Sequence, residues 1–502
     1  MASLLGLGVL LTITATIAGT PARDATPYKV VCYFESWAVY RTGKGKYDVE
    51  DIDPYICTHY VYTFAGLKND HTIVSLDPWN DLYADYGRGA YLRFTRMKQK
   101  NPEIKTMLSI GGWNEGSKKY SQMASTAANR KKFINSVVKF LHKFNFDGLD
   151  LDWEYPTLRG GAPDDVDNYS LLLKELHERL NPLGLLLSAA VSAGKQTIDP
   201  AYHLADLNKY LDIVNVMTYD YHGDWDPFIG HNSPLYLSHL DVEHGNNFEY
   251  FSVNYSMNYY LRVIEPSKLM LGMPFYGRGF VLANSEHHTP YDPSNGPMAG
   301  CPYSGEPGFC GYNELCEKIL KPTWTYVRDS EQKVIYGYKG NTWVGWDDLQ
   351  AVKLKMEFLK SLGLGGAMIW AIDSDDFRGV CGPKYPLLNL VWSELNGAVP
   401  SPSPLPTTTP DPTAPTHHTR PTKPTPPPGP TPEPSHVCVK PGLNPDPDKM
   451  CSPYFYECVQ NGDSWDYQQF SCGDGSVFDR VKLVCVWPDD SDECKTTPAP
   501  SA

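Results

Sequence analysis

The first 370 or so residues of the 502-residue chain alternate between short apolar segments and longer amphipathic ones. Eight short segments have the length of strands, and several are the near-continuous apolar runs that parallel strands need when helices cover both faces. They are Lys29–Trp37, Tyr60–Gly66, Thr106–Trp113, Gly148–Tyr155, Leu185–Ser192, Ile213–Tyr221, Leu269–Tyr276 and Gly366–Ile372. Amphipathic segments between them include Arg130–Asn145, Val166–Asn181 and Trp346–Leu362. Eight strands separated by helices predict an α/β fold, the (β/α)8 TIM barrel.

A doubly wound open sheet is the main alternative for such an alternation. The barrel is favoured because no glycine-rich phosphate loop follows the first predicted strand. About 90 residues separate the seventh predicted strand from the eighth, too many for one helix. They include a strand-like run, Lys333–Tyr338, and we expect a small α+β insertion at about 279–345. Placed at the catalytic face of the barrel, this insertion would form one wall of a groove.

The run FDGLDLDWEYP at residues 146–156, in the fourth predicted strand, carries the strongest functional signal. Its apolar and acidic residues alternate, so Asp150, Asp152 and Glu154 share one face at a spacing of roughly 6.5–7 Å. Three like charges on an apolar strand repel one another and lose hydration, which a sequence tolerates where carboxylates do chemistry. A solvated acidic edge would not place leucine and tryptophan on its other face, and the glycine and glutamate of an EF-hand loop are missing.

Catalytic groups of TIM barrels lie at the C-terminal ends of the strands. We expect Glu154 nearest the mouth of the barrel, where it would meet a substrate, and Asp150 deepest, where hydrogen bonds or shared protons must hold it. The other polar or aromatic residues at the predicted strand ends are Glu35, Trp37, Phe64, Gly112, Trp113, Tyr155, Tyr219, Asp220, Tyr276, Arg278 and Trp370.

The N-terminus and the cysteines indicate secretion to the extracellular space. Residues 4–17 are apolar and small residues follow, so we expect residues 1–22 to be a signal peptide, although the usual basic residues before the apolar stretch are missing. No other stretch is apolar for eighteen residues, so the mature protein should be soluble. Twelve cysteines in two groups of six suit an oxidising compartment. Sequons at Asn168 and Asn254 are candidate N-glycosylation sites.

The formal net charge of −14 argues against nucleic acids and anionic membranes as partners. A neutral ligand is more natural, and some of the 33 tyrosines and 12 tryptophans could offer flat faces to sugar rings, although most of them must fill the core. The histidines form no metal-ligand pattern and no serine or cysteine nucleophile motif is present, so we expect neither a metal nor another cofactor. Nothing in the sequence demands more than a monomer.

The composition changes sharply near Val399. Residues 400–434 contain fifteen prolines and nine threonines, which predicts an extended tether. Residues 438–494 are too few to build a large core and hold six cysteines, which predicts a three-disulfide scaffold with fifteen possible connectivities. We therefore expect a signal peptide at 1–22, a barrel at 23–396, a linker at 397–435, a C-terminal module at 436–496 and a tail at 497–502.

The acidic run resembles a known family signature. Asp147, Asp150, Asp152 and Glu154 match the D-x-x-D-x-D-x-E pattern of glycoside hydrolase family 18, the chitinases. Neighbouring motifs agree, namely SIGGW at 109–113, MTYD at 217–220 and Trp370. The resemblance extends over all eight predicted strands, from about residue 28 to residue 395, and is strongest to secreted arthropod chitinases.

This resemblance implies an endochitinase that cleaves β-1,4 bonds between N-acetylglucosamine units with retention of configuration. Family 18 is an exception to the usual two-carboxylate scheme. Glu154 would protonate the leaving oxygen while the acetamido oxygen of the substrate attacks, which gives an oxazolinium intermediate, and Glu154 would then activate water. Asp152 would hold the acetamido N–H, with Asp150 beneath it. The charge of Asp152 would raise the pKa of Glu154.

The resemblance also implies sugar-binding roles at the other strand ends. Tyr219 and Asp220 would hold the acetamido group and the distorted sugar, with Met217 beneath, and Trp370 would form the floor. The other matched positions along the cleft are Tyr33, Trp37, Phe64, Gly112, Trp113, Trp225, Tyr276 and Arg278. Chitinase-like lectins keep the barrel but lose the acid at the position of Glu154. A non-catalytic chitin-binding lectin or matrix protein is therefore the alternative function.

Family resemblance extends to the disulfides and to the C-terminal module. In the barrel it implies Cys32–Cys57 and Cys316–Cys381, which leaves Cys301 and Cys310 as a local pair. The module resembles the chitin-binding type 2 (peritrophin-A) domain, which implies Cys438–Cys458, Cys451–Cys494 and Cys472–Cys485. Its aromatic residues Tyr456, Trp465, Tyr467 and Trp487 could stack on sugars or fill the small core, and Trp465 and Trp487 are the candidates for contact. The implied partners are chitin and its oligosaccharides.

Overall fold

The computed structural model describes residues 27–398 and, in the C-terminal region, residues 438–439, 442–452, 454–461, 464–472, 477–480, 484–486 and 494. The predicted signal peptide and nearly all of the predicted linker lie outside the described residues. None of the described helices is long and apolar enough to cross a bilayer.

Eight parallel strands close into a barrel, which confirms the predicted fold. The order around the ring is β1-β15-β8-β7-β6-β5-β4-β2, and pairing of β1 with β2 closes it. The strands are β1 (Lys29–Glu35), β2 (His59–Leu67), β4 (Lys105–Gly111), β5 (Gly148–Asp152), β6 (Leu186–Ser192), β7 (Ile213–Met217), β8 (Leu269–Pro274) and β15 (Gly366–Trp370). A short strand, β3 (Ile73–Ser75), pairs antiparallel with β2.

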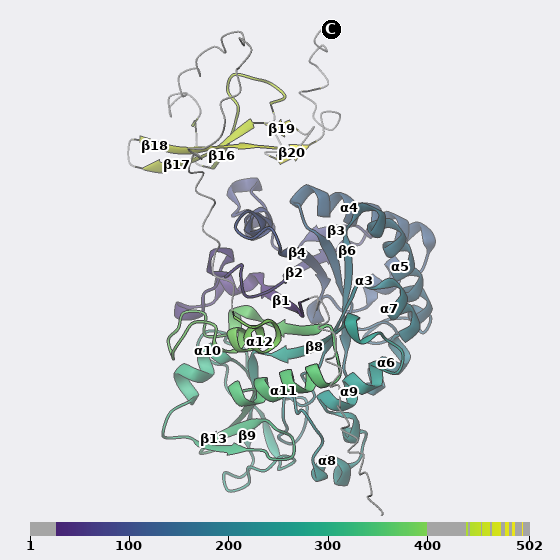
Figure 1. Cartoon of the computed structure of the whole chain (residues 1–502), viewed down its shortest axis with the longest axis vertical. Helices are drawn as coiled ribbons and strands as arrows, with labels where there is room; N and C mark the ends of the chain where they lie inside the picture. Colours follow the sequence, from purple (N-terminus) through teal and green to yellow (C-terminus); the bar gives the residue numbers. More distant parts are fainter. Residues whose placement is uncertain are drawn as a thin grey trace, which may run out of the picture.

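Helices cover the outside of the ring, as Figure 1 shows for α4, α5 and α7. The longest, α4 (Ala127–Phe144), begins where the Thr126 hydroxyl accepts the Asn129 N–H at 3.2 Å, and it ends at Asn145 in the left-handed conformation. The others are α1 (Pro78–Asp81), α2 (Ala90–Thr95), α3 (Lys118–Ala124), α5 (Asp165–Leu180), α6 (Lys195–Ala201), α7 (Leu204–Tyr210), α8 (His239–His244), α9 (Val253–Tyr260), α10 (Tyr312–Glu314), α11 (Leu349–Ser361) and α12 (Pro386–Asn396).

The strand β5 ends at Asp152, three residues before the predicted end. Its pairing with β4 stops where Asp152 lies opposite Gly111. The next side chain, Trp153, is buried among the helices, where its ring nitrogen donates to the Ser117 hydroxyl at 3.1 Å. The alternation of apolar and acidic residues therefore continues past the last strand pairing, and Glu154 lies in the loop that follows.

An antiparallel sheet forms the insertion between β8 and β15, as predicted, and in Figure 1 its strands β9 and β13 stand outside the barrel ring. The order is β10-β9-β14-β13-β12, and β11 also pairs with β9. The strands are β9 (Tyr276–Leu282), β10 (Ser294–Pro297), β11 (Phe309–Gly311), β12 (Thr325–Arg328), β13 (Ile335–Lys339) and β14 (Thr342–Trp346). Because β9 starts directly after β8, the insertion begins at the end of the barrel where the C-termini of the parallel strands lie.

The helix predicted from Trp346 starts later than expected. Trp346 is the last residue of β14, where it pairs with Ile335. The helix α11 begins after Asp348, whose Oδ1 accepts the Ala351 N–H at 2.9 Å. An aspartate that satisfies a free N–H of the first turn sets the helix start, and the apolar pattern upstream belongs to the strand.

The C-terminal module is a small β structure with disulfides. The strands β16 (Gly442–Pro445), β17 (Tyr454–Asn461) and β18 (Ser464–Ser471) form one antiparallel sheet, and β19 (Val477–Asp479) pairs with β20 (Val484–Val486). Phe455 stacks on Phe478 with ring centroids 4.4 Å apart, and Tyr456 is buried against Cys438 and Cys458. Tyr456 therefore belongs to the small core.

Five disulfides join the pairs that the two family resemblances imply. They are Cys32–Cys57, Cys301–Cys310, Cys316–Cys381, Cys438–Cys458 and Cys451–Cys494. The sixth pair, Cys472–Cys485, includes a side chain outside the described residues. The side chains of the two candidates for sugar contact in the module, Trp465 and Trp487, also lie outside them.

Candidate active site

Asp150 lies fully buried in the barrel, and four donors surround its carboxylate. The register places Ser109 of β4 and Ser188 of β6 opposite it, and their hydroxyls donate to Oδ2 at 2.8 Å and to Oδ1 at 2.5 Å. The Tyr33 hydroxyl donates to Oδ2 at 2.9 Å, and Asn215 Nδ2 donates to Oδ1 at 3.3 Å. Burial raises the pKa of Asp150 and these hydrogen bonds lower it. The hydrogen bonds expected to hold Asp150 are therefore present.

Three of these donors were not identified as site residues from the sequence. Ser109, Ser188 and Asn215 each lie within a buried, largely apolar strand, and each is at most 1% exposed. A polar residue inside such a strand needs a partner, because an unpaired buried hydroxyl or amide is costly. That signal could have been used, although it would not have named Asp150 as the partner.

Asp152, the last residue of β5, is 3% exposed, and its Oδ1 has no hydrogen-bond partner among the described residues. Burial raises the pKa of Asp152 well above its usual range, and the charges of Glu154 and Asp150 raise it further. A buried acceptor without a donor costs stability. Such an acceptor suits a binding site in which a ligand N–H completes the pairing.

Glu154 follows β5 by two residues and is partly buried. The pKa of Glu154 is raised to about 7. Burial is the largest cause and the charge of Asp220 adds to it, while a hydrogen bond with Tyr155 and the charge of Arg159 lower the pKa in part. The expected cause was the charge of Asp152. In the structure burial is the larger cause, and the repulsion between the two carboxylates raises the pKa of Asp152 instead. Near neutral pH the pair therefore retains a proton.

Asp220 is bound by two residues of β9. The Tyr276 hydroxyl and Arg278 Nε both donate to its Oδ1 at 2.8 Å. Tyr276 and Arg278 are two residues apart on one strand, so their side chains share a face. The Tyr219 ring meets the Tyr276 ring edge-on at 6.1 Å. This group brings together predicted residues from β9 and from the loop after β7.

Phe309 of β11 also belongs to this group and was missed in the sequence. Its ring stacks on Tyr276 with centroids 4.6 Å apart. Phe309 lies opposite Arg278 in the pairing of β11 with β9. No local sequence pattern links two residues more than thirty positions apart, so only the tertiary pairing identifies Phe309.

Trp370, the last residue of β15, is the centre of a second group. Its ring lies 5.5 Å from Tyr33, 5.9 Å from Phe64 and 6.4 Å from Trp37. Trp37 and Phe64 stack on each other at 5.9 Å. Met217 is partly buried beside the same interior side chains. Tyr33 is 1% exposed, so it supports Trp370 and Asp150 from below and does not line an open surface.

Trp113 and Trp225 are largely exposed, at 57% and 56%. The Arg159 guanidinium lies 3.4 Å from the centroid of Trp113, and that of Arg278 lies 5.2 Å from the centroid of Trp225. These cation–π contacts hold each ring on one side. Exposed rings held in this way could stack on a sugar.

Gly112 acts through its backbone. Its N–H donates to the Asp152 carbonyl oxygen at 2.8 Å, and its φ is 85°. A Cβ at this position would lie 2.7 Å from the Phe64 ring. Glycine is therefore required for the close approach of this loop to the aromatic group.

Asp147, the first acid of the signature, lies at the opposite end of β5. Its Oδ2 accepts the Thr106 N–H at 2.7 Å and its Oδ1 accepts Lys98 Nζ at 2.9 Å. Its contacts join the start of the strand to its neighbour and lie away from the other three carboxylates.

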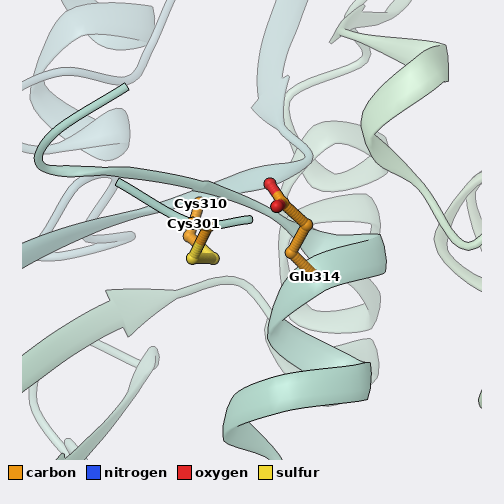
Figure 2. Close-up of side chains that lie close together, drawn as sticks. All are labelled: Cys301, Cys310 and Glu314. Carbon is orange, nitrogen blue, oxygen red and sulfur yellow. A yellow bond between two sulfur atoms is a disulfide. The ribbon is translucent and has the colours of Figure 1, made fainter. Parts of the chain in front are cut away.

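Two groups of cysteine and acidic side chains lie close enough together to resemble metal ligands. One consists of Cys301, Cys310 and Glu314, shown in Figure 2, and the other of Cys316, Asp376 and Cys381. In both groups the cysteines form a disulfide, so they have no thiolate to offer a metal. Glu314 accepts the Ser304 N–H at 3.2 Å and so stabilises the loop that the Cys301–Cys310 disulfide closes.

The two sequons differ in exposure. Asn168 is 8% exposed and its Nδ2 donates to Asp164 at 3.2 Å. Asn254 is half-buried on α9, and its Oδ1 accepts Asn258 Nδ2 at 3.0 Å. Of the two candidates, Asn254 is the more exposed.

Two family models match the chain. The model of the glycosyl hydrolases family 18 matches residues 29–375, and the model of the chitin binding Peritrophin-A domain matches residues 438–494. Among curated proteins, "Probable chitinase 2" of Drosophila melanogaster is 43% identical over 363 residues, which cover 70% of this chain and 73% of that protein.

Two solved structures are also similar. The Ostrinia furnacalis Group IV chitinase in complex with allosamidin is 42% identical with a TM-score of 0.71, and the match covers 74% of this chain and all of that one. Human YKL-39, described as a pseudo-chitinase with retained chitooligosaccharide binding properties, is 38% identical with a TM-score of 0.67 over 73% of this chain and 99% of that one. Similarity of fold therefore does not by itself decide catalysis.

Proposed function

The chain belongs to family 18 of the glycosyl hydrolases and hydrolyses chitin, and we propose that it does so by a retaining, substrate-assisted reaction at Asp152 and Glu154. The substrate would be chitin or an oligosaccharide of β-1,4-linked N-acetylglucosamine. The enzyme would cleave internal bonds of this polysaccharide. Trp370 would carry the sugar whose bond breaks, and Asp220 and Tyr219 would hold its acetamido group.

In the first step the protonated Glu154 carboxyl gives its proton to the glycosidic oxygen, and the bond from that oxygen to the anomeric carbon breaks. The acetamido carbonyl oxygen of the same sugar attacks the anomeric carbon and forms a cyclic oxazolinium ion. When the proton shared by the pair is on Glu154, Asp152 is charged, so it accepts the acetamido N–H and its negative charge stabilises the cation. A carboxyl with a pKa near 7 is well suited to act as the acid at neutral or mildly acidic pH.

In the second step the Glu154 carboxylate takes a proton from water while the water oxygen attacks the anomeric carbon. The bond between the anomeric carbon and the acetamido oxygen breaks, which opens the oxazolinium ring and restores the acetamido group. Water enters from the face that the leaving group left, so the β configuration is retained. Asp150, already bound by four donors, would support Asp152 throughout as a fixed negative charge.

The observation that carries this proposal is the unpaired oxygen of Asp152 beside a carboxyl with a raised pKa. Oδ1 of Asp152 is buried without a hydrogen-bond partner among the described residues. A substrate amide N–H would supply the missing donor and remove that cost. A barrel that only bound sugar would have no need of a neighbouring acid with a pKa near 7.

We also propose that the protein is exported, acts as a monomer and uses the C-terminal module to stay on insoluble chitin. The disulfides in both domains support an oxidising location. A module that binds the polymer raises the effective concentration of the barrel at its surface. The negative charge of the chain supports a neutral polymer as the partner over nucleic acid or an anionic membrane.

The direct test is hydrolysis of chitohexaose by the wild type and by Glu154→Gln. We expect the wild type to release di- and trisaccharides and the variant to lose at least about 1,000-fold in kcat, because it has neither acid nor base. Products are identified by mass, and the anomer formed first is identified by early-time NMR. Glu178→Gln, an exposed glutamate on α5, is the matched control and should retain full activity.

The alternative function predicts a different result. If the wild type and Glu154→Gln bind the hexamer equally and neither cleaves it, the protein is a chitin-binding lectin or matrix protein. If the wild type cleaves it but the α-anomer forms first, hydrolysis is inverting and the oxazolinium route is excluded.

A further inference from the structure

We propose that Asn232 is a positioning residue that holds Asp220 in the orientation needed for hydrolysis. This role depends on the proposed function, because it assumes that Asp220 binds the sugar whose bond is cleaved. Asn232 lies in the segment between β7 and α8 and is 2% exposed. It carries no charge and does not belong to the group formed by Asp220, Tyr276 and Arg278.

Asp220 needs a support because its backbone adopts an unfavourable conformation. Its φ of 56° lies in the left-handed region, which residues other than glycine rarely occupy. In this conformation its Oδ1 meets the Tyr276 hydroxyl and Arg278 Nε, each at 2.8 Å. Relaxation of the backbone would move the carboxylate away from both donors and away from the sugar.

The Asn232 side chain joins the two segments that must stay together. Its Oδ1 accepts the Asp220 N–H at 2.8 Å, and its Nδ2 donates to the Tyr276 carbonyl oxygen at 3.1 Å. Only this orientation of the amide satisfies both partners, since an N–H needs the oxygen and a carbonyl needs the nitrogen. One buried amide therefore ties the backbone of Asp220 to β9, the strand that carries both donors to its carboxylate.

The next residue fastens the same segment to the barrel. The Ser233 hydroxyl donates to the Thr218 carbonyl oxygen at 2.6 Å. Lys355 of α11 donates to Ser233 Oγ at 2.6 Å, to the Ser233 carbonyl oxygen at 2.7 Å and to Asp347. All three N–H groups of this fully buried ammonium thus have acceptors, and two of them are on Ser233. The segment that carries Asn232 is therefore rigidly held, as a positioning element must be.

The first test compares kcat and KM for chitohexaose in the wild type and in Asn232→Ala. We expect kcat/KM to fall about 10- to 100-fold, since an error of about 1 Å in a positioning group can cost that much. Asn101→Ala is the matched control and should leave activity unchanged. Asn101 also accepts one backbone N–H, from Glu103 at 3.2 Å, and donates to one carbonyl, that of Pro54 at 2.8 Å, but before β4 at the other end of the barrel.

A double-mutant cycle with Asp220→Ala separates positioning from general damage to the fold. In the Asp220→Ala background the carboxylate that Asn232 positions is absent. Adding Asn232→Ala should then lower kcat/KM by less than about threefold, because the two losses share one cause. A residue that only maintained the fold would cause the same loss in both backgrounds.

A second variant, Asn232→Asp, serves if Asn232→Ala fails to fold. It keeps the shape of the side chain and the acceptor for the Asp220 N–H. It can donate to the Tyr276 carbonyl only while its carboxyl is protonated. Its activity relative to the wild type should therefore be highest at low pH and fall as the pH rises through the pKa of the new carboxyl.

The outcomes distinguish this role from the proposed function. If the wild type cleaves the hexamer but the cycle is additive, or Asn232→Asp shows no relative loss with rising pH, Asn232 is not a positioning residue and the proposed function stands. If the wild type does not cleave the hexamer at all, the proposed function and the role of Asn232 are both excluded.

Discussion

At the level of single residues, burial controls the protonation of the carboxylates in the active site. Asp150 and Asp152 lie on the same buried strand, but Asp150 has four donors and Asp152 Oδ1 has none among the described residues. Glu154, beyond the strand end, has a pKa near 7. In the proposed mechanism the same functional group, a carboxyl, would thus serve as a fixed charge, as an acceptor that awaits a donor and as an acid, according to its surroundings.

The pKa of Glu154 predicts how activity depends on pH. Glu154 must be protonated to act as the acid, so activity is present below its pKa and is lost as the pH rises through about 7. Arg159 lowers this pKa through its charge, so Arg159→Gln should move the alkaline limb of the profile to higher pH. The measurement is kcat/KM for chitohexaose between pH 4 and pH 10.

Lys174→Gln on α5 is the control for a general change of charge, since Lys174 is exposed and pairs only weakly with Glu178 at 4.0 Å. Its profile should match that of the wild type. An alkaline limb that did not move in Arg159→Gln would contradict the electrostatic role of Arg159. The variant also loses the contact of Arg159 with the Trp113 ring.

At the level of elements, the end of β4 and the end of β5 determine the shape of the site. A Cβ on Gly111 would lie 2.0 Å from the Asp152 carbonyl oxygen, and one on Gly112 would lie 2.7 Å from the Phe64 ring. Because neither glycine has a Cβ, the loop after β4 can cross directly over the end of β5. The strand end, the aromatic group and the carboxylates are therefore mechanically linked.

Gly112→Ala should destabilise the fold by about 3 kcal/mol or more, because an unfavourable backbone conformation and a collision with Phe64 add together. Activity should fall as well, since Phe64 supports Trp370. Gly184→Ala is the matched control: its φ is 69°, but nothing lies within 4 Å of the added Cβ. It should cost only about 1 kcal/mol and leave activity intact. Thermal unfolding and hexamer hydrolysis measure the two effects, and equal losses in both variants would exclude the collision.

The existence and order along the chain of the eight barrel strands could be predicted, and their C-terminal ends could not. All eight barrel strands lie where the apolar runs predict them. The alternation that marks β5 continues to Glu154, but pairing with β4 stops at Asp152. Where a strand ends depends on its neighbours, and an apolar residue such as Trp153 can be buried in a strand or among helices with the same local pattern.

At the level of the whole molecule, the barrel and the C-terminal module have separate disulfides. Their buried clusters are also distinct, although Tyr83 of the barrel packs against the cluster of Phe455, Cys472 and Phe478 in the module. A solved chitinase of Ostrinia furnacalis is covered over its whole length by 74% of this chain, so a barrel of this size exists without the module. The proposed linker would let the two domains act on one substrate. Attachment and cleavage should then be separable.

Deletion of residues 399–502 tests this separation. Hydrolysis of soluble chitohexaose should be unchanged, because every proposed catalytic residue precedes residue 399. Binding to insoluble chitin should weaken by at least about tenfold, since the second attachment is lost. Depletion of each protein from solution by chitin particles is the measurement. Equal depletion of both proteins would show that the barrel alone attaches to the polymer.

The sequence by itself determined the barrel, the family and the three carboxylates, because periodicity and a dense motif are local properties of the chain. It did not determine what surrounds those carboxylates. Tyr33, Ser109, Ser188 and Asn215 come from four different strands, and they meet at Asp150 only through the closure and register of the barrel. Asn232 reaches both Asp220 and Tyr276 for the same reason. Hydrogen bonds and pKa values depend on distances between groups far apart in the chain, so only the tertiary structure decided them.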